Sequence, residues 1–307
     1  MSRRPRTIAP LLATAGLAVV GLSPAASAQS LAGYTGSTGS VGAFGSESAP
    51  VPTPPIPGVS GVLTIPVPAQ ARAAAEVGVA SVYPTPGETV GVAQPVMIHF
   101  DGPVTDRARA EASVSIRTAP AVGGKFYWVS DTELRWRPHE FWPAHTSVTV
   151  WAGGREHAFR TGDAIVSTYD DNTHLVTVTR NGEVIRTMRA SAGRDTFPTH
   201  NGIYYNGWRD RQVRMDSSTW GLAMDAGGYD TTVENGVRLS YDGIFIHSAP
   251  WSVADQGVRN VSHGCINVSP EDAAWYYDNT GNGDPFIVVN GPGRQFGAFD
   301  GQGDWNY

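Results

Sequence analysis

The stretch Ser262-His263-Gly264-Cys265-Ile266-Asn267 decides how the fold of this 307-residue chain is interpreted, together with the apolar run that ends in His247. Cys265 is the only cysteine in the sequence. A lone thiol next to a histidine and a glycine turn is a common arrangement for a cysteine nucleophile. The alternative is an inert buried cysteine that behaves as a small hydrophobic residue. The local motif favours the nucleophile.

His247 is the stronger candidate for the base that activates this thiol. It follows the strand-like run Ile244-Phe245-Ile246, which would hold its ring rigidly. The carbonyl of Ser248 is placed to fix the tautomer through the other ring nitrogen. A free thiol has a pKa near ~8.5, so the imidazole is expected to take its proton and hold an ion pair. No acid is obvious at that position, and a Cys-His-Asp arrangement is not predicted.

The turn at Gly264 is the second part of the predicted site. Glycine permits an unusual backbone angle and close approach of a substrate, and consecutive N–H groups there would form an oxyanion hole. His263 either contacts the substrate or shapes the turn. A zinc site of His247, His263 and Cys265 is the alternative, but the spacing fits no common metal motif. We therefore predict neither a metal nor a cofactor.

Residues 77–162 read as a small antiparallel sandwich of immunoglobulin-like type. Runs such as 96–100 and 147–151 are short and lie between turns, which is typical of such sandwiches. Four tryptophans in this part suggest carbohydrate binding, but several lie in alternating strand patterns, which favours core packing. These are Trp128, Trp136, Trp142 and Trp151.

Residues 163–292 form a second β-rich unit. Asn181-Gly182 between two alternating runs predicts a hairpin with a type I′ turn. Ser269-Pro270 predicts the start of a short helix, with serine as N-cap and proline in the first turn. Residues 293–307 read as a polar tail with aromatic residues. The predicted fold class is therefore mainly β, an immunoglobulin-like sandwich followed by a β-rich catalytic domain with a short helix after the cysteine.

The N-terminal part predicts export. Residues 1–28 have a basic start, an apolar run over 8–22 and an Ala-Ser-Ala cleavage site, as in a signal peptide. An uncleaved anchor is the alternative and the only predicted route to a membrane. Residues 29–76 are rich in Gly, Ser and Pro and read as a flexible linker. Losing residues 1–28 removes three arginines and changes the formal charge from −6 to −9, which argues against nucleic-acid binding.

The spacing of these motifs resembles a known signature. His247, fourteen intervening residues and then 262–267 are similar to the signature of the L,D-transpeptidases with a YkuD-type catalytic domain. The flanks 247–251, 215–219 and 301–306 are similar too, in particular to wall-cross-linking members with immunoglobulin-like modules. The resemblance extends from about residue 77 to the C-terminus.

The resemblance implies a substrate and a reaction. The substrate would be peptidoglycan: Cys265 would attack the third residue of a tetrapeptide stem and expel the terminal D-alanine. The thioester would pass to a side-chain amine of a neighbouring stem, giving a 3→3 cross-link. His247 would act as base and then as acid, and the amides around His263, Gly264 and Cys265 would hold the oxyanion. Carbapenem β-lactams would acylate the cysteine, and the protein would work in the cell envelope.

The resemblance also implies a set of residues that line the substrate site. Asp242 stands where the family has serine and Trp220 where tyrosine is expected, so these two contacts depart from the pattern. A closing segment over 215–235 is expected as well, because acyl transfer to an amine must exclude water. The implied substrate-binding residues are Met215, Trp220, Tyr229, Asp242, Gly243, Trp251, Ser262 and Asn267.

Two other functions remain open at this point. The same thioester with water as acceptor would make the protein an L,D-carboxypeptidase or another hydrolase, since the acceptor is chosen by the shape of the groove. A non-catalytic wall-binding protein is the third possibility, and the presence of both His247 and Cys265 argues against it.

Overall fold

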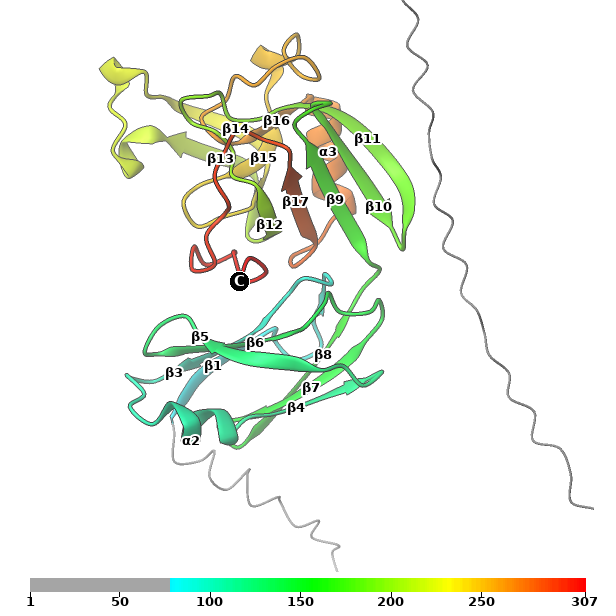
Figure 1. Cartoon of the computed structure of the whole chain (residues 1–307), viewed down its shortest axis with the longest axis vertical. Helices are drawn as coiled ribbons and strands as arrows, with labels where there is room; N and C mark the ends of the chain where they lie inside the picture. The colour runs from blue at the N-terminus through cyan, green and yellow to red at the C-terminus, as the bar shows by residue number, and fades with distance from the viewer. Residues whose placement is uncertain (1–77) are drawn as a thin grey trace, which may run out of the picture. The chain divides into compact units, whose positions relative to one another are not determined.

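The computed structural model describes residues 78–307, which lie within one compact unit. The predicted signal segment 1–28 and linker 29–76 lie outside the described residues. Strands dominate the described part, so the predicted mainly β class is confirmed (Figure 1). Over residues 78–307, no helix has the length and apolar character needed to span a membrane.

The first folded part is a sandwich of two four-stranded sheets. One sheet has the order β1-β3-β6-β5, formed by Val79–Tyr83, Val96–Phe100, Glu133–Pro138 and Gly124–Trp128. The other has the order β2-β8-β7-β4, formed by Thr89–Val90, Arg155–Thr161, Ser147–Ala152 and Ser115–Ala119. A short helix, α2 (Arg107–Ala112), completes it. Trp136 and Trp142 are buried in its core and Trp128 packs against that core, as expected, whereas Trp151 of β7 is half-buried and lies outside this cluster.

The second part is built on one nine-stranded sheet with the order β12-β17-β9-β10-β11-β16-β15-β14-β13. From one edge to the other these strands are Gly202–Tyr205, Pro285–Val289, Ile165–Asp170, Leu175–Arg180, Glu183–Ser191, Ile266–Val268, Phe245–Ser248, Asp230–Arg238 and Arg209–Asp216. Helix α3 (Pro270–Asn279) packs against β14 and β15.

Local sequence signals account for two of these elements. Asn181 and Gly182 both have positive φ, 51° and 89°, as the type I′ turn between β10 and β11 requires. The Ser269 side chain accepts a hydrogen bond from the backbone N–H of Asp272 at 3.1 Å and so caps α3, with Pro270 in the first turn.

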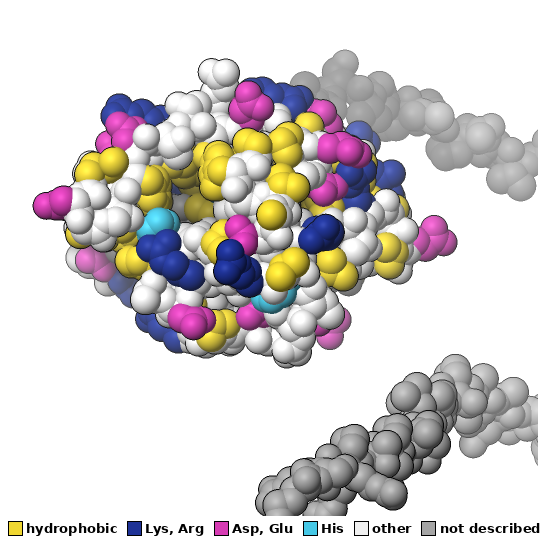
Figure 2. Space-filling model, turned by 90° about the horizontal axis from the view of Figure 1, so that it is seen from above, with side chains coloured by type: hydrophobic (Ala, Val, Ile, Leu, Met, Phe, Trp, Pro, Cys, Tyr) yellow, Lys and Arg dark blue, Asp and Glu magenta, His cyan; other side chains and the backbone are white. Residues whose placement is uncertain are grey.

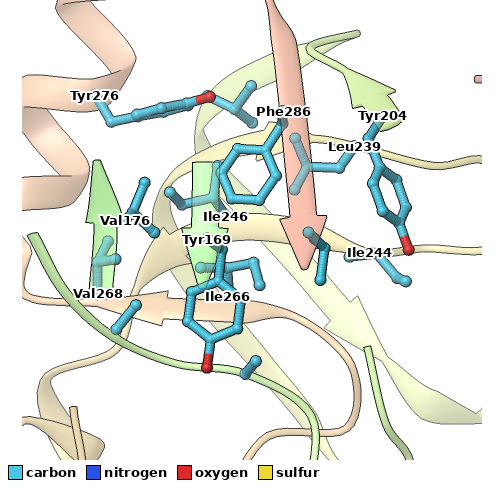
Figure 3. Close-up of a cluster of buried hydrophobic side chains, with 14 of the residues drawn as sticks. Tyr169, Val176, Tyr204, Leu239, Ile244, Ile246, Ile266, Val268, Tyr276 and Phe286 are labelled. Atoms are coloured by element: carbon cyan, nitrogen blue, oxygen red, sulfur yellow. The ribbon is translucent and has the colours of Figure 1, made fainter. Parts of the chain in front are cut away.

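The core of the second part packs against the strands that carry His247 and the cysteine motif. Buried aliphatic and aromatic side chains from β9, β10, β15, β16, β17 and α3 pack together, as Figure 3 shows. Its largest fully buried members are Tyr169, Tyr204, Tyr276, Phe286, Met188, Leu239, Ile246 and Ile266. This cluster supports the two short strands β15 and β16, so residues at their ends are held on a rigid base.

The C-terminal segment 293–307 is packed into the structure. Asp304 is 1% exposed, and its carboxylate accepts hydrogen bonds from Arg135 of β6 at 2.8 Å and from the hydroxyl of Tyr205 in β12 at 2.7 Å. Trp305 donates its indole N–H to the carbonyl of Ala93 at 2.8 Å. The segment therefore connects residues of the sandwich with residues of the second domain.

Candidate active site

The cysteine and its candidate base lie on adjacent parallel strands. His247 is in β15, and Cys265 directly precedes β16. The register pairs Ile246 with Ile266 and His247 with Asn267. Because both strands are buried in the sheet, the positions of thiol and imidazole are fixed by backbone hydrogen bonds.

A cavity of about 340 Å³ opens at this point. Figure 2 shows a hollow on this face, bordered by hydrophobic side chains with histidine and basic side chains beside it. Eight of the predicted site residues line the cavity: Met215, Tyr229, His247, Trp251, Ser262, His263, Cys265 and Asn267. Three further lining residues, Thr231, Val233 and Val261, were not predicted from the sequence.

Burial keeps the thiol protonated. Cys265 is 9% exposed, and burial raises its pKa to about 11, with a further rise from the charge of Asp242. The backbone of Phe245 acts in the opposite direction. The thiol donates a hydrogen bond to the carbonyl oxygen of Gly243, 3.7 Å from Sγ.

The imidazole of His247 is also neutral. Its burial lowers the pKa to about 4, against the opposing effect of its hydrogen bond to Ser248. Nδ1 donates to the Ser248 carbonyl oxygen at 2.9 Å, so Nε2 is the nitrogen left to accept a proton. The ion pair expected from the sequence is therefore disfavoured in the resting site, because burial favours the neutral form of both partners.

The conformation of the cysteine turn is fixed by hydrogen bonds within the turn and by one from Thr199. The Ser262 hydroxyl donates to the Cys265 carbonyl at 2.6 Å and accepts the N–H of Gly264 at 3.0 Å. The Thr199 hydroxyl donates to the Gly264 carbonyl at 2.7 Å. Gly264 has a φ of 121°, which favours glycine. Since Ser262 occupies the Gly264 amide, the amides of His263 and Cys265 remain as candidate oxyanion donors.

The segment between β13 and β14 covers one side of the cavity. It contains two short 3-10 helices, Ser217–Trp220 and Met224–Ala226, and extends from the end of the sheet (Figure 1). Tyr229 packs beside Cys265, and its ring lies 5.0 Å from that of His263. Trp220 is 44% exposed and lies outside the cavity lining, against Tyr229 and Phe197.

Asn267 and Trp251 form the other side. The Asn267 amide donates to the Ser252 hydroxyl at 3.1 Å, which anchors the loop after β15. Trp251 in the 3-10 helix Pro250–Ser252 is 60% exposed, with its ring 6.1 Å from that of His247. An exposed tryptophan at the cavity edge is available to contact a ligand.

Asp242 and Gly243 lie beside the thiol rather than in the cavity lining. The Asp242 carboxylate accepts a hydrogen bond from the Ser240 hydroxyl and interacts with Asp300. Burial raises the pKa of Asp300 to about 6, and the charge of Asp242 adds to this rise. In residues 78–307, no three His, Cys, Asp or Glu side chains form a group that could hold a metal ion.

Comparisons with known proteins agree with this arrangement. Residues 69–154 match the family described as bacterial Ig domain, and residues 164–288 match the L,D-transpeptidase catalytic domain. L,D-transpeptidase 1 of Mycobacterium tuberculosis (strain H37Rv) is 47% identical over 213 residues, which cover 69% of this chain and 85% of the relative. The chain belongs to the L,D-transpeptidase family.

Two further matches extend the comparison. L,D-transpeptidase 2 of Mycobacterium tuberculosis (strain CDC 1551 / Oshkosh) is 45% identical over 240 residues, covering 73% of this chain but only 59% of that relative. The structure of the LD transpeptidase LdtMt1 in complex with imipenem has a TM-score of 0.67 and 47% sequence identity. It covers 69% of this chain and 99% of that one.

Three residues that contact the cysteine turn from a distant loop were not predicted from the sequence. Thr199, Arg194 and Phe197 come from the loop after β11, about 65 residues before the cysteine, and contact Gly264 or His263. No local pattern marks such contacts, because they depend on the pairing of Gly193 with Ser262.

Proposed function

We propose that this L,D-transpeptidase cross-links peptidoglycan stems through a thioester on Cys265. The observation that carries the proposal is the cavity that brings Cys265, His247 and the cysteine turn together under a covering segment. Nucleophile, base and oxyanion donors are the three parts that acyl transfer needs. The family and the imipenem complex of a relative support this choice of chemistry.

The first step forms the acyl-enzyme. His247 Nε2 takes the thiol proton as Sγ attacks the carbonyl of the third stem residue, and the amides of His263 and Cys265 stabilise the oxyanion. The carbon–nitrogen bond then breaks, and protonated His247 gives its proton to the leaving amine of D-alanine. Because both groups start neutral, the charge separation develops only as the bond forms.

The second step transfers the acyl group. The neutral side-chain amine of a neighbouring stem attacks the thioester, His247 accepts the amine proton, and Sγ leaves and recovers a proton from His247. The products are a 3→3 amide and the free enzyme. Water would give a tripeptide instead, so the apolar wall of Met215, Val233 and Tyr229 supports transfer over hydrolysis.

The setting of the reaction is part of the proposal. The export signal predicted for residues 1–28 would deliver the protein to the cell envelope, where its substrate is. The immunoglobulin-like domain would then act as a spacer that orients the catalytic domain, and the contacts of Asp304 with Arg135 and Tyr205 support a fixed orientation.

Intact-protein mass spectrometry with imipenem tests the acyl site. We expect a one-to-one adduct on the wild-type protein and none on Cys265→Ala. Absence of an adduct on folded wild type would overturn the nucleophile assignment and favour the wall-binding function. Chromatography of the products formed from purified disaccharide-tetrapeptide then distinguishes the two activities. A 3→3 dimer marks a transpeptidase, whereas tripeptide alone marks a carboxypeptidase.

A further inference from the structure

The Ser248 carbonyl that fixes the tautomer of His247 belongs to a peptide unit with anchors of its own. The N–H at the other end of this peptide, on Ala249, donates to the Val268 carbonyl of β16 at 2.9 Å. Pro250 follows, so the next peptide has no N–H, and hydrogen bonds can hold it only through the Ala249 carbonyl. The orientation of the base therefore depends on the groups that bind this carbonyl.

The Ala249 carbonyl is bound by a set of buried donors. It accepts the backbone N–H of Ser252 at 3.1 Å, the Ser252 hydroxyl at 3.2 Å and the side-chain amide of Gln256 at 3.1 Å. The Ser252 hydroxyl in turn accepts from the side-chain amides of Gln256 at 3.4 Å and Asn267 at 3.1 Å. Ser252, Gln256 and Asn267 are 1%, 2% and 3% exposed. One hydroxyl and two amides thus form a buried network next to the peptide that orients the base.

The burial of Gln256 calls for a physical reason. Taking a side-chain amide out of water is unfavourable unless its polar atoms are hydrogen-bonded, and an apolar side chain would fill the same space without that cost. Gln256 does not line the cavity, so contact with a substrate does not account for the amide. What the amide supplies is a donor to the backbone that follows β15.

The position of Gln256 is itself fixed by the sheet. Its backbone N–H donates to the Ser252 carbonyl at 3.1 Å, and the N–H of the next residue, Gly257, donates to the Ala190 carbonyl of β11 at 2.8 Å. Strand β16 lies between β11 and β15 in the sheet. Through Gln256, the Ala249 carbonyl is therefore tied to a loop that is anchored on the other side of the strand following Cys265.

We propose that Gln256 is a positioning residue that sets the tautomer of His247 by holding the Ala249 carbonyl. With the Ala249 N–H and carbonyl both bound, the Ser248 carbonyl stays 2.9 Å from Nδ1 and accepts its proton. Without the Gln256 donor, the backbone at Ala249 gains rotational freedom, and the Ser248 carbonyl faces Nδ1 for only part of the time. His247 then also populates the tautomer with its proton on Nε2.

The tautomer matters because the ring is neutral. Burial lowers the pKa of His247 to about 4, so near pH 7 the imidazole carries one proton and only the other nitrogen can act as a base. The consequence for the reaction rests on the proposed function, in which Nε2 takes the proton of Cys265. Enzyme with the proton already on Nε2 is inactive in that step, so Gln256 would affect the rate without touching the reacting atoms.

The direct test is the tautomer of His247 in the free protein, read by NMR of ¹⁵N-histidine-labelled enzyme with His247→Asn for assignment. We expect a protonated Nδ1 and an unprotonated Nε2 in the wild type. Gln256→Met keeps the unbranched side chain but has no donor, and we expect it to show both tautomers. Ser252→Ala removes the central hydroxyl and should shift the tautomer in the same direction, so the test does not depend on one variant folding. Gln212→Met, on an exposed position of β13, is the matched control and should leave the tautomer unchanged.

The rate of imipenem acylation supplies the second readout. We expect it to fall about threefold to tenfold in Gln256→Met, the equivalent of one lost hydrogen bond. An unchanged tautomer in both Gln256→Met and Ser252→Ala would overturn the proposal even if acylation slowed, because the network would then support the fold alone. A protonated Nε2 in the wild type would overturn it as well. The NMR readout uses unreacted protein, so a wild type that imipenem does not acylate would refute the proposed function and leave this inference testable.

Discussion

The reactivity of Cys265 towards a small alkylating reagent distinguishes a neutral pair from a preformed ion pair. We expect the rate of alkylation by iodoacetamide to rise about tenfold per pH unit from pH 7 to 10, without a plateau. The reason is that burial raises the pKa of Cys265 to about 11 and lowers that of His247 to about 4. Thiolate is then formed by hydroxide and not by the imidazole.

The expected rate follows from these values. At pH 8, a thiol with a pKa of 9 is about 10% thiolate, and one with a pKa of 11 is about 0.1%. The more basic thiolate is intrinsically about six to ten times more nucleophilic, since reactivity rises with a Brønsted slope near 0.4–0.5. The folded protein should therefore react roughly ten to fifteen times more slowly than the same cysteine in unfolded chain.

The assay is a time course of intact mass at each pH, in buffer and in guanidinium chloride. His247→Asn provides the control: its rate should stay within about twofold of wild type from pH 8 to 10, because the neutral imidazole adds no charge. A pH-independent plateau between pH 6 and 8 that disappears in His247→Asn would refute the reasoning. Such a plateau would establish a resting thiolate–imidazolium pair.

Three further substitutions test other parts of the site and fold. Thr199→Val leaves the motif glycine without its hydroxyl partner and should cost about 1–3 kcal/mol in urea unfolding while slowing imipenem acylation, whereas Thr199→Ser should preserve both. Asp242→Asn removes a charge that raises the thiol pKa, so alkylation at pH 8 should become faster; an unchanged rate would contradict this. Asp304→Asn removes one of the two carboxylates that pair with buried Arg135, which keeps its ion pair with Glu133, and should cost about 1–3 kcal/mol of unfolding free energy. A loss below about 1 kcal/mol would contradict a tightly held C-terminal segment.

The parts of the fold that were predictable from the sequence are those with local causes. Asn181-Gly182 specifies its turn through positive φ angles, and Ser269-Pro270 specifies the start of α3 through a capping hydroxyl. The position of His247 at the end of an apolar strand was also readable, because a run of buried residues needs no tertiary information. The prediction of the second domain as a whole came from its resemblance to a known signature.

The missed features depend on contacts between distant segments. Thr231 and Val233 face the cavity because β13 and β14 pair in a particular register. The local sequence does not indicate which face of this long hairpin lies toward the cavity. From the sequence alone, Asp304 is a charged residue in a polar tail. Its role as the partner of Arg135 follows only from the folded structure. The resting charge state also depends on tertiary structure, since the degree of burial determines whether two titratable groups ionise.

A neutral resting pair has a chemical advantage in the proposed setting. A thiolate is the species that oxidants and disulfides attack, and if this protein is exported as proposed, its one cysteine has no second thiol to protect it. A thiol with a raised pKa is poorly reactive towards both. It becomes nucleophilic only when a carbonyl carbon is placed beside Sγ and the proton can pass to Nε2 of His247 in the same step. The burial that makes Cys265 slow towards iodoacetamide would therefore preserve it for the stem peptide, whose binding supplies the orientation that the small reagent lacks.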